Sequence, residues 1–338
     1  MDSTENKKVT VIVAGSWGTS LAFVLASNGY RVHIWTRNEN QANEINEKHT
    51  NEKYLPNHKL PHHIVATTSL EDALRDSELA LFVVPSSAMR EIAHKASAYI
   101  SDSTIVVHAT KGFEPTTFKR MREVLAEELK RDINHIGVLS GPSHAEEVIM
   151  QQPTTVVVAS KDQQVAVKAQ ELLMNKIFRV YTNDDVIGIE VAGALKNIIA
   201  LAAGLINGLQ FGDNAKAALL TRGLAEISRL GVAMGANPMT FIGLAGVGDL
   251  VVTATSPHSR NWRAGFKLAS GSSLDEVLSE MGMVVEGVKT TRAAFELAKL
   301  YEIDMPITEQ LYEVLFLNRP LREAVNKLMS RDKTYEMR

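Results

Sequence analysis

The sequence predicts an α/β domain built on a mostly parallel, doubly wound sheet, followed by an all-helical domain. In the first half of the chain, short apolar and β-branched runs alternate with helical stretches, which is typical of strands linked by crossover helices. After about residue 183, strand-like runs become rare and apolar residues recur at helical spacing. We therefore expect domains at residues 1–183 and 184–338, and 338 residues are enough for two cores.

The expected strands are short apolar runs, as in strands that are buried on both faces. They cover residues 9–13, 31–35, 79–84, 104–108, 136–139, 155–159 and 178–181. Between the first two, we expect a turn from Gly15 to Gly18 and a helix over residues 19–28 that Gly29 closes.

The expected helices of the second half cover residues 186–210, 214–235, 273–281, 288–302 and 308–316. The first is long enough to cross a bilayer. However, Glu190, Lys196 and Asn197 interrupt it near its centre. We expect the core helix of a globular domain and no membrane span.

Composition excludes several function classes. The net charge is −3 with no long block of one sign, so we expect no nucleic-acid partner. The chain has no cysteine, which excludes disulfides and thiol catalysis, and no His/Asp/Glu cluster has metal-ligand spacing, so no metal is expected. The N-terminus is polar and unlike a secretory signal, which favours a cytoplasmic protein.

Lys196 lies near the middle of the longest apolar stretch of the chain, residues 186–210. Burial there would remove hydration from the ammonium and lower its pKa towards the range useful for proton transfer. Its neighbours on the same helical face are small and leave room for a ligand: Ala192, Gly193, Ala200 and Gly204. Alternatively, the stem packs while the charged head reaches solvent.

A glycine-containing loop, VAGSWG at residues 13–18, follows the first expected strand. Gly15 would let the backbone approach a phosphate, and Gly18 would let helix and strand pack closely. The position predicts a Rossmann-like domain that binds a dinucleotide pyrophosphate at a helix N-terminus. A purely structural turn is the alternative.

Arg37 stands nineteen residues after Gly18, where an NAD-binding domain usually places an acid for the ribose 2′-hydroxyl. A carboxylate there would repel a 2′-phosphate, whereas a guanidinium can bind one. We therefore expect NADP(H) to be preferred, with NAD(H) also possible. An exposed arginine at a strand end is the structural alternative.

Two further groups of candidates follow expected strands. Lys111 comes directly after the strand at residues 104–108, so it should lie at the carboxyl edge of the sheet. Gly141, Ser143 and Ala145 stand between another strand and the start of a helix.

The remaining candidates lie in the second half. Ser259 and Asn261 flank the guanidinium of Arg260, an arrangement that suits a phosphate, although a solvated helix start is the alternative. Asp249 and Glu286 each stand out among apolar and small residues. Either acid is a helix cap or a polar group directed into a site.

Ten segments occur together in one order and carry a family resemblance. They are AGSWGT (14–19), NEKYLPN (51–57), VVPS (83–86), TKGFE (110–114), LSGPSHAEEV (139–148), GALKNIIALAAG (193–204), GDNAKAAL (212–219), GVGDL (246–250), HSRNWRAG (258–265) and MVVEGV (283–288). The chain resembles the bacterial NAD(P)-dependent glycerol-3-phosphate dehydrogenases from its first strand almost to its C-terminus.

The resemblance implies interconversion of dihydroxyacetone phosphate and sn-glycerol 3-phosphate, with hydride passing between C2 and the nicotinamide, in support of phospholipid synthesis. It implies that Lys196 gives or takes the proton of the C2 oxygen. The implied substrate contacts are Lys111, Gly141, Ser143, Lys196, Asp249, Ser259, Arg260 and Asn261. The implied cofactor contacts are Ser16, Trp17, Arg37, Tyr54, Lys111, Ala145, Arg260 and Glu286. A homodimer is expected because dimers are common in such folds.

Val13 departs from the family pattern, because it replaces the first glycine of GAGSWG. A positive φ at this position would strain a β-branched residue by roughly 1–3 kcal/mol. A negative φ would leave a possible clash with the dinucleotide. We expect weakened cofactor affinity with the chemistry retained.

Two other functions remain open from the sequence. A 6-phosphogluconate or 3-hydroxyacid dehydrogenase would share the predicted plan and a lysine on a helix. A non-catalytic NADP(H) sensor would explain Val13, but it would not need Lys111, Lys196, Asp249 and Arg260 together.

Overall fold

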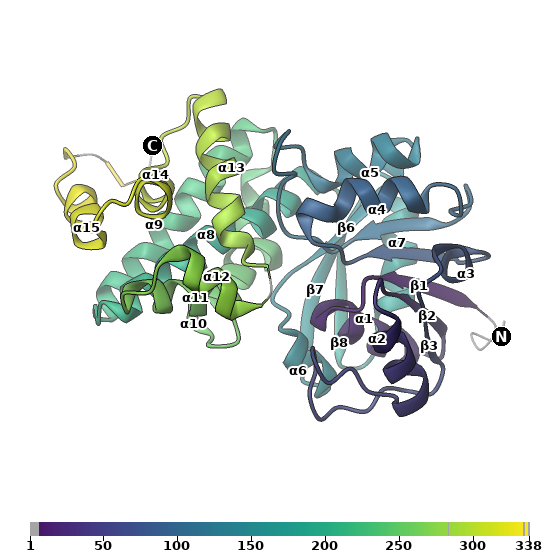
Figure 1. Ribbon diagram of the computed structural model, residues 1–338. Coiled ribbons are helices and arrows are strands. Elements are labelled where there is room, and N and C mark those ends of the chain that lie inside the picture. Colours follow the sequence, from purple (N-terminus) through teal and green to yellow (C-terminus); the bar gives the residue numbers. More distant parts are fainter. Residues whose placement is uncertain (1–6, 283, 334, 337–338) are drawn as a thin grey trace. The chain divides into compact units, whose positions relative to one another are not determined.

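The computed structural model describes residues 7–282, 284–333 and 335–336 (Figure 1). Met283 of the segment 283–288 and the polar residues 1–6 therefore lie outside the described part. The chain divides into two compact units, the first formed by residues 1–193 and 236–249 and the second by residues 194–235 and 250–338.

The first unit is built on one eight-stranded sheet with the strand order β3-β2-β1-β4-β5-β6-β7-β8. Its strands are β1 (Lys8–Ile12), β2 (Arg31–Trp35), β3 (Ile64–Thr67), β4 (Leu79–Phe82), β5 (Ile105–His108), β6 (Ile136–Ser140), β7 (Thr154–Ala159) and β8 (Phe178–Asn183). All neighbouring strands pair in parallel except β6 and β7. This arrangement confirms the predicted, mostly parallel, doubly wound sheet.

Helices cover both faces of this sheet. The α-helices that precede α8 are α1 (Ser16–Ser27), α2 (Glu39–Asn43), α3 (Leu70–Leu74), α4 (Met89–Ala96), α5 (Met121–Leu129), α6 (Ala145–Ile149) and α7 (Gln163–Leu173). Apolar residues of α1, α6 and α7 pack in one buried cluster with β1, β2 and β7, whereas those of α3, α4 and α5 pack in a second cluster. The two clusters are the cores on the two faces of the sheet.

Two local predictions for this unit were wrong. Strand β3 was not predicted, because it has four residues and lies at the sheet edge with Val65 40% exposed, so it lacks a long apolar run. Helix α1 begins at Ser16 and not at residue 19. A Cβ on Gly18 would lie 2.1 Å from the Val13 carbonyl oxygen, so Gly18 lets the first helical turn pack directly against the preceding loop.

The second unit is helical in its described residues. The helices from α8 onward are α8 (Val186–Gly208), α9 (Asp213–Ala233), α10 (Asp249–Thr255), α11 (Arg260–Ala269), α12 (Leu274–Met281), α13 (Glu286–Leu300), α14 (Pro306–Phe316) and α15 (Leu321–Met329). The five predicted helices correspond to α8, α9, α12, α13 and α14. The short helices α10, α11 and α15 were missed.

Glycines bring α8 and α11 into direct backbone contact. A Cβ on Gly204 would lie 2.0 Å from the Trp262 carbonyl oxygen, and one on Gly265 would lie 2.0 Å from the Leu201 carbonyl oxygen. The small face of α8 near Gly204 is therefore filled by α11. The expectation that this part of the face leaves room for a ligand was wrong.

Helix α8 supplies residues to both units. Its first turns contribute Val186 and Ile189 to a buried cluster with Val138 of β6, Val157 of β7 and Ala245. This burial explains why residues 184–193 and 236–249 belong to the first unit, whereas we predicted the division after residue 183. By length and composition alone α8 could cross a membrane, but 94% of its most apolar window is buried within the protein.

Candidate active site

The glycine loop lies between β1 and α1 and has the form of a phosphate cradle. Gly15 is the N-cap of α1, its φ is −76°, and a Cβ built on it would meet nothing within 4 Å. Gly15 has no side chain to cap the helix, so the amides of the first turn, which begins with Ser16 and Trp17, have no side-chain cap. The loop therefore fits a dinucleotide pyrophosphate, which needs N–H donors and close backbone approach.

Val13 adopts a positive φ of +84°. Its N–H continues the sheet by donating to the Trp35 carbonyl at 2.9 Å, and its side chain packs partly buried against one core cluster. Val13 therefore has a strained backbone conformation, which costs roughly 1–3 kcal/mol of stability for a β-branched residue.

The other predicted cofactor residues of the first unit lie on segments that contact α1. The hydroxyl of Ser16 donates to the carbonyl of Tyr54 at 3.0 Å. The hydroxyl of Ser20 donates to the carbonyl of Ala145 at 2.8 Å, which joins α1 to the start of α6. These bonds bring Ser16, Tyr54 and Ala145 to one side of the first helical turn.

Arg37 lies two residues beyond the end of β2, at the carboxyl edge of the sheet. Its side chain is half exposed and pairs with the equally exposed Glu91, with Nη2 of Arg37 and Oε2 of Glu91 3.1 Å apart. The guanidinium holds the pKa of Glu91 below its usual range, together with Lys95 whose hydrogen bond is the larger cause. An exposed pair of this kind exchanges easily for another anion.

Lys111 and Asp249 meet although 138 residues separate them. The Lys111 ammonium donates to Asp249 Oδ2 at 2.6 Å and to the Gly141 carbonyl at 3.2 Å. Asp249 is 1% exposed. The structure thus brings three predicted substrate residues together, and the hydroxyl of Ser143 also donates to the Gly141 carbonyl, at 2.9 Å.

Backbone geometry explains two of the glycines near Lys111. Gly141 has a φ of +130°, and a Cβ there would lie 3.0 Å from Val156 Cα. A Cβ on Gly193 of α8 would lie 3.0 Å from Ser140 Oγ and 3.6 Å from Lys111 Cγ. Larger residues at positions 141 and 193 would therefore crowd the space around the Lys111 stem.

A buried group of charges supports β5, the strand that precedes Lys111. Glu190 of α8 lies 3.2 Å from His108 Nε2 at the end of β5, and its Oε1 also accepts the Arg122 N–H at 2.9 Å. Burial by itself raises the pKa of Glu190, but His108, Arg120 and the Arg122 N–H outweigh it and hold the pKa below its usual range. The charged carboxylate ties α8 to β5 and to the start of α5.

Lys196 is 5% exposed and its ammonium donates to the hydroxyl of Thr253 at 2.5 Å. The lysine stem therefore does not carry its charge to open solvent. Thr253, on α10, is itself 6% exposed. The candidate acid/base group is thus buried beside a hydroxyl, within the second unit.

The segment 259–261 has a larger structural role than we predicted. Ser259 is the N-cap of α11, and its hydroxyl accepts the Trp262 N–H at 3.3 Å. The Asn261 amide donates to Asn197 Oδ1 and its oxygen accepts the Gly287 N–H, both at 2.9 Å. Asn261 therefore joins α8, α11 and the start of α13.

These bonds also place the remaining predicted residues of the second unit. Arg260 is the first residue of α11, and Glu286 is the first residue of α13, directly before Gly287. Both lie at the helix starts that Asn261 connects. Whether they contact a ligand stays a prediction.

Four residues that contact the candidate site groups were missed from the sequence. They are Thr253 beside Lys196, Asn197 beside Asn261, and Gln41 and Asn51 beside the glycine loop. Asn197 and Asn51 lie inside the quoted segments GALKNIIALAAG and NEKYLPN, so they could have been selected. Nothing in the local sequence marks Gln41 or Thr253.

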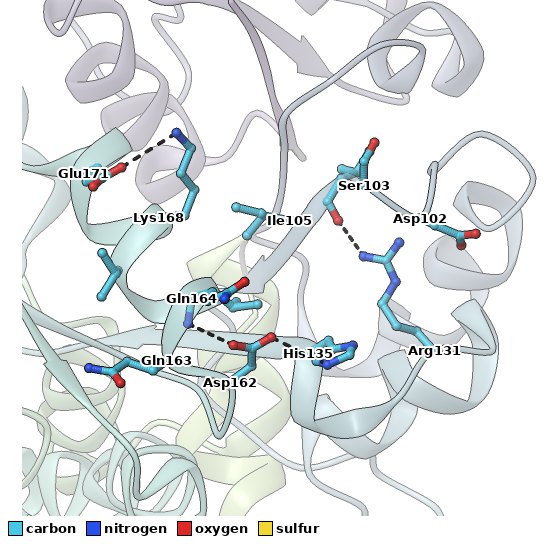
Figure 2. A pocket seen from close by; sticks show the side chains of 13 residues that line it. Asp102, Ser103, Ile105, Arg131, His135, Asp162, Gln163, Gln164, Lys168 and Glu171 are labelled. Atoms are coloured by element: carbon cyan, nitrogen blue, oxygen red, sulfur yellow. Dashed lines mark hydrogen bonds and ion pairs between the residues drawn. The ribbon is translucent and has the colours of Figure 1, made fainter.

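A cavity of about 650 Å³ lies in the first unit at the amino end of β5, opposite the edge that carries the glycine loop (Figure 2). Several of its charged residues pair with one another or with the backbone: Lys168 with Glu171, His135 with Asp162, and Arg131 with the Ser101 carbonyl. It contains none of the predicted site residues. Within the described residues, no group of three His, Asp or Glu side chains could hold a metal ion.

Comparison with known proteins agrees with this geometry. Residues 8–166 match the family described as NAD-dependent glycerol-3-phosphate dehydrogenase N-terminus, and residues 185–326 match the corresponding C-terminus. The chain is 58% identical to a glycerol-3-phosphate dehydrogenase [NAD(P)+] of Enterococcus faecalis over 96% of each chain. It is 56% identical to the enzyme of the same name from Bacillus thuringiensis, over 98% of this chain and 97% of that one.

Solved structures give the same result. The crystal structure of glycerol-3-phosphate dehydrogenase from Coxiella burnetii superposes with a TM-score of 0.91 at 38% identity, covering 96% of this chain and 99% of that one. A ketopantoate reductase from Ralstonia eutropha has a TM-score of 0.58 at 14% identity, over 96% of this chain and 99% of that one, and shares the fold alone. Glycine loop, family matches and superposition lead to one conclusion: the chain belongs to the NAD-dependent glycerol-3-phosphate dehydrogenase family.

Proposed function

We propose that this protein interconverts dihydroxyacetone phosphate and sn-glycerol 3-phosphate with NADP(H) or NAD(H). The relatives named above carry this activity in their names. The observation that supports the proposal most directly is Lys196, a 5% exposed lysine that donates to the Thr253 hydroxyl from a mostly apolar helix. Burying a cation costs free energy, and buried ionisable groups of this kind cluster at functional sites.

Lys196 acts as the acid or base at the C2 oxygen of the substrate. Reduction of a carbonyl builds negative charge on its oxygen, and a buried ammonium stabilises that charge and then gives up a proton. In the opposite direction the neutral amine accepts the proton of the C2 hydroxyl. Thr253 orients the amine by accepting one of its hydrogen bonds.

The dinucleotide fits the glycine loop and, when bound, supplies the hydride donor or acceptor. The loop amides after Gly15 would hold its pyrophosphate. Arg37 would bind a 2′-phosphate in place of Glu91, which is the basis for preferring NADP(H) over NAD(H). The further cofactor contacts that we propose are Ser16, Trp17, Tyr54, Lys111, Ala145, Arg260 and Glu286.

The phosphate of the substrate needs a cationic anchor, and we assign this role to Arg260 at the N-terminus of α11. Lys111, oriented by Asp249 and the Gly141 carbonyl, contributes a second positive charge. Gly141, Ser143, Ser259 and Asn261 complete the proposed set of substrate contacts. Asn261 acts by holding the helix starts as well.

In the cell, the reaction would supply glycerol 3-phosphate for phospholipid synthesis. We also propose that the protein is cytoplasmic and that it forms a homodimer, because dimers are common in such folds. The proposal includes no metal, nucleic acid or membrane partner.

The test is a substrate panel in which NADPH oxidation is followed at its absorbance band. Dihydroxyacetone phosphate should be reduced, with a higher kcat/KM for NADPH than for NADH. The panel also contains 3-keto acids, and 6-phosphogluconate is offered in the oxidising direction with NADP. Turnover of either competitor without turnover of dihydroxyacetone phosphate would assign the chain a different dehydrogenase activity, and NADPH binding without any turnover would make it a sensor.

A further inference from the structure

Two side-chain amides hold one carbonyl of the glycine loop. The Ala14 carbonyl oxygen, directly after Val13, accepts Gln41 Nε2 at 2.7 Å and Asn51 Nδ2 at 3.0 Å. The two amides also bind each other, since Gln41 Nε2 donates to Asn51 Oδ1 at 3.0 Å. We call Gln41 and Asn51 the amide clamp.

The amide clamp is itself fixed on both sides. Asn51 is 1% exposed, and its amide also donates to the hydroxyl of Thr19, in the first turn of α1, at 2.8 Å. The Gln41 side-chain oxygen accepts the hydroxyl of Thr36, just beyond β2, at 2.5 Å. The clamp therefore links the end of β2, α1, α2 and the segment after α2 to a single peptide group of the loop.

This peptide group, between Ala14 and Gly15, lies one residue beyond the strained Val13. Val13 has a φ of +84°, a conformation that a β-branched side chain avoids, and such residues persist only where their surroundings over-determine them. A loop without the clamp would relax towards negative φ at Val13 and would move the Ala14 carbonyl and the Gly15 amide. The amide clamp opposes that relaxation by holding the Ala14 carbonyl in place.

We propose that Asn51 and Gln41 are positioning residues that hold the glycine loop in its dinucleotide-binding conformation, and that Val13 makes the loop depend on them. The inference rests on the proposed dinucleotide site. It predicts energetic coupling between Asn51 and position 13, two residues that need not touch. A glycine at position 13 adopts positive φ without strain, so a loop with that substitution should need the clamp much less.

The test is a double-mutant cycle on NADPH binding, read by the quenching of tryptophan fluorescence and not by activity. Asn51→Ala should raise the Kd for NADPH by about tenfold, equivalent to about 1.4 kcal/mol. In the Val13→Gly background the same substitution should raise the Kd by about twofold, because the competent loop stays populated. Val13→Gly alone should lower the Kd by about threefold.

The matched control is Thr50→Ala. Thr50 precedes Asn51 and is 7% exposed, and its hydroxyl donates to Glu44 Oε1 at 2.9 Å. This variant loses one buried hydrogen bond of the same segment and should leave the Kd within about twofold of the wild type. An equal effect of Asn51→Ala in both backgrounds, or an equal effect of Thr50→Ala, would overturn the proposal.

Amide hydrogen exchange without dinucleotide separates a failure of this inference from a failure of the proposed function. Asn51→Ala should accelerate exchange in residues 13–19 by about tenfold, and Val13→Gly should restore protection. Unchanged exchange would refute the clamp even if NADPH binds. Faster exchange in a protein that binds no NADPH would keep the clamp and refute the proposed cofactor.

Discussion

Glu226 should make the stability of the second unit depend on pH in the neutral range. This carboxylate, from α9, is 1% exposed and caps the start of α14, where Oε1 accepts the Ile307 N–H at 2.6 Å and Oε2 the Thr308 N–H at 3.2 Å. Burial raises the pKa of Glu226 from 4.5 to about 7, against the hydrogen bonds from Ile307 and Thr308, which lower it.

The raised pKa sets both the sign and the size of the effect. The folded protein holds the Glu226 proton more tightly than the unfolded chain does, so the stabilisation is fully present below about pH 4.5 and is lost as the pH rises through about 7. At about 1.4 kcal/mol for each pKa unit, the difference amounts to about 3 kcal/mol. Glu226→Gln, a neutral isostere, should remove this slope.

The assay is urea unfolding at about pH 5 and about pH 8. The wild type should lose about 3 kcal/mol of unfolding free energy between these values and Glu226→Gln less than about 1 kcal/mol. Glu276→Gln is the matched control, because Glu276 caps α12 through the Ser273 N–H in full exposure and its pKa is lowered by that bond. It should keep the wild-type slope. Equal slopes for the wild type and Glu226→Gln would refute the reasoning.

Three further predictions concern the proposed ligand contacts. Arg37→Ala should lower kcat/KM for NADPH by about tenfold and leave kcat/KM for NADH unchanged, while Glu91→Gln should not lower kcat/KM for NADPH. An equal loss for both cofactors in Arg37→Ala would contradict the assignment. Arg260→Ala should raise the KM for dihydroxyacetone phosphate by about 10- to 100-fold, and an unchanged KM would remove it as the phosphate anchor. Asp249→Asn should lower kcat/KM for the same substrate at least about tenfold, because Lys111 loses its buried charged partner. The Kd for NADPH is measured for comparison, and a similar loss of NADPH affinity would indicate general damage to the protein.

The sequence predicted the sheet of the first unit well, because seven of its strands are apolar runs bounded by turn residues. The eighth, β3, has an exposed face, so its pattern does not differ from that of a loop. Helix α11 was not predicted for a related reason. It packs through Gly265 against the backbone of α8, and a glycine contributes no apolar periodicity.

Single reactive residues of the site could be predicted from the sequence. The partners to which they are hydrogen-bonded could not. Lys196 and Lys111 stand out by charge and position, but their partners Thr253 and Asp249 come from distant segments. Asp249 was selected only as an acid in an apolar stretch. The sequence shows that Val13 stands at a glycine position of the family, but it does not give the φ of this residue. The structure gives a φ of +84°.

The central claim is that Lys196 provides the proton at the C2 oxygen. The direct measurement is single-turnover reduction of dihydroxyacetone phosphate by Lys196→Met, with NADPH binding measured on the same sample and Lys216→Met, an exposed lysine paired with Asp213, as the matched control. The rate should fall by about a thousandfold while the NADPH Kd stays within about threefold, and the control should match the wild type. A Lys196→Met protein that keeps more than about a tenth of the wild-type rate would contradict the account.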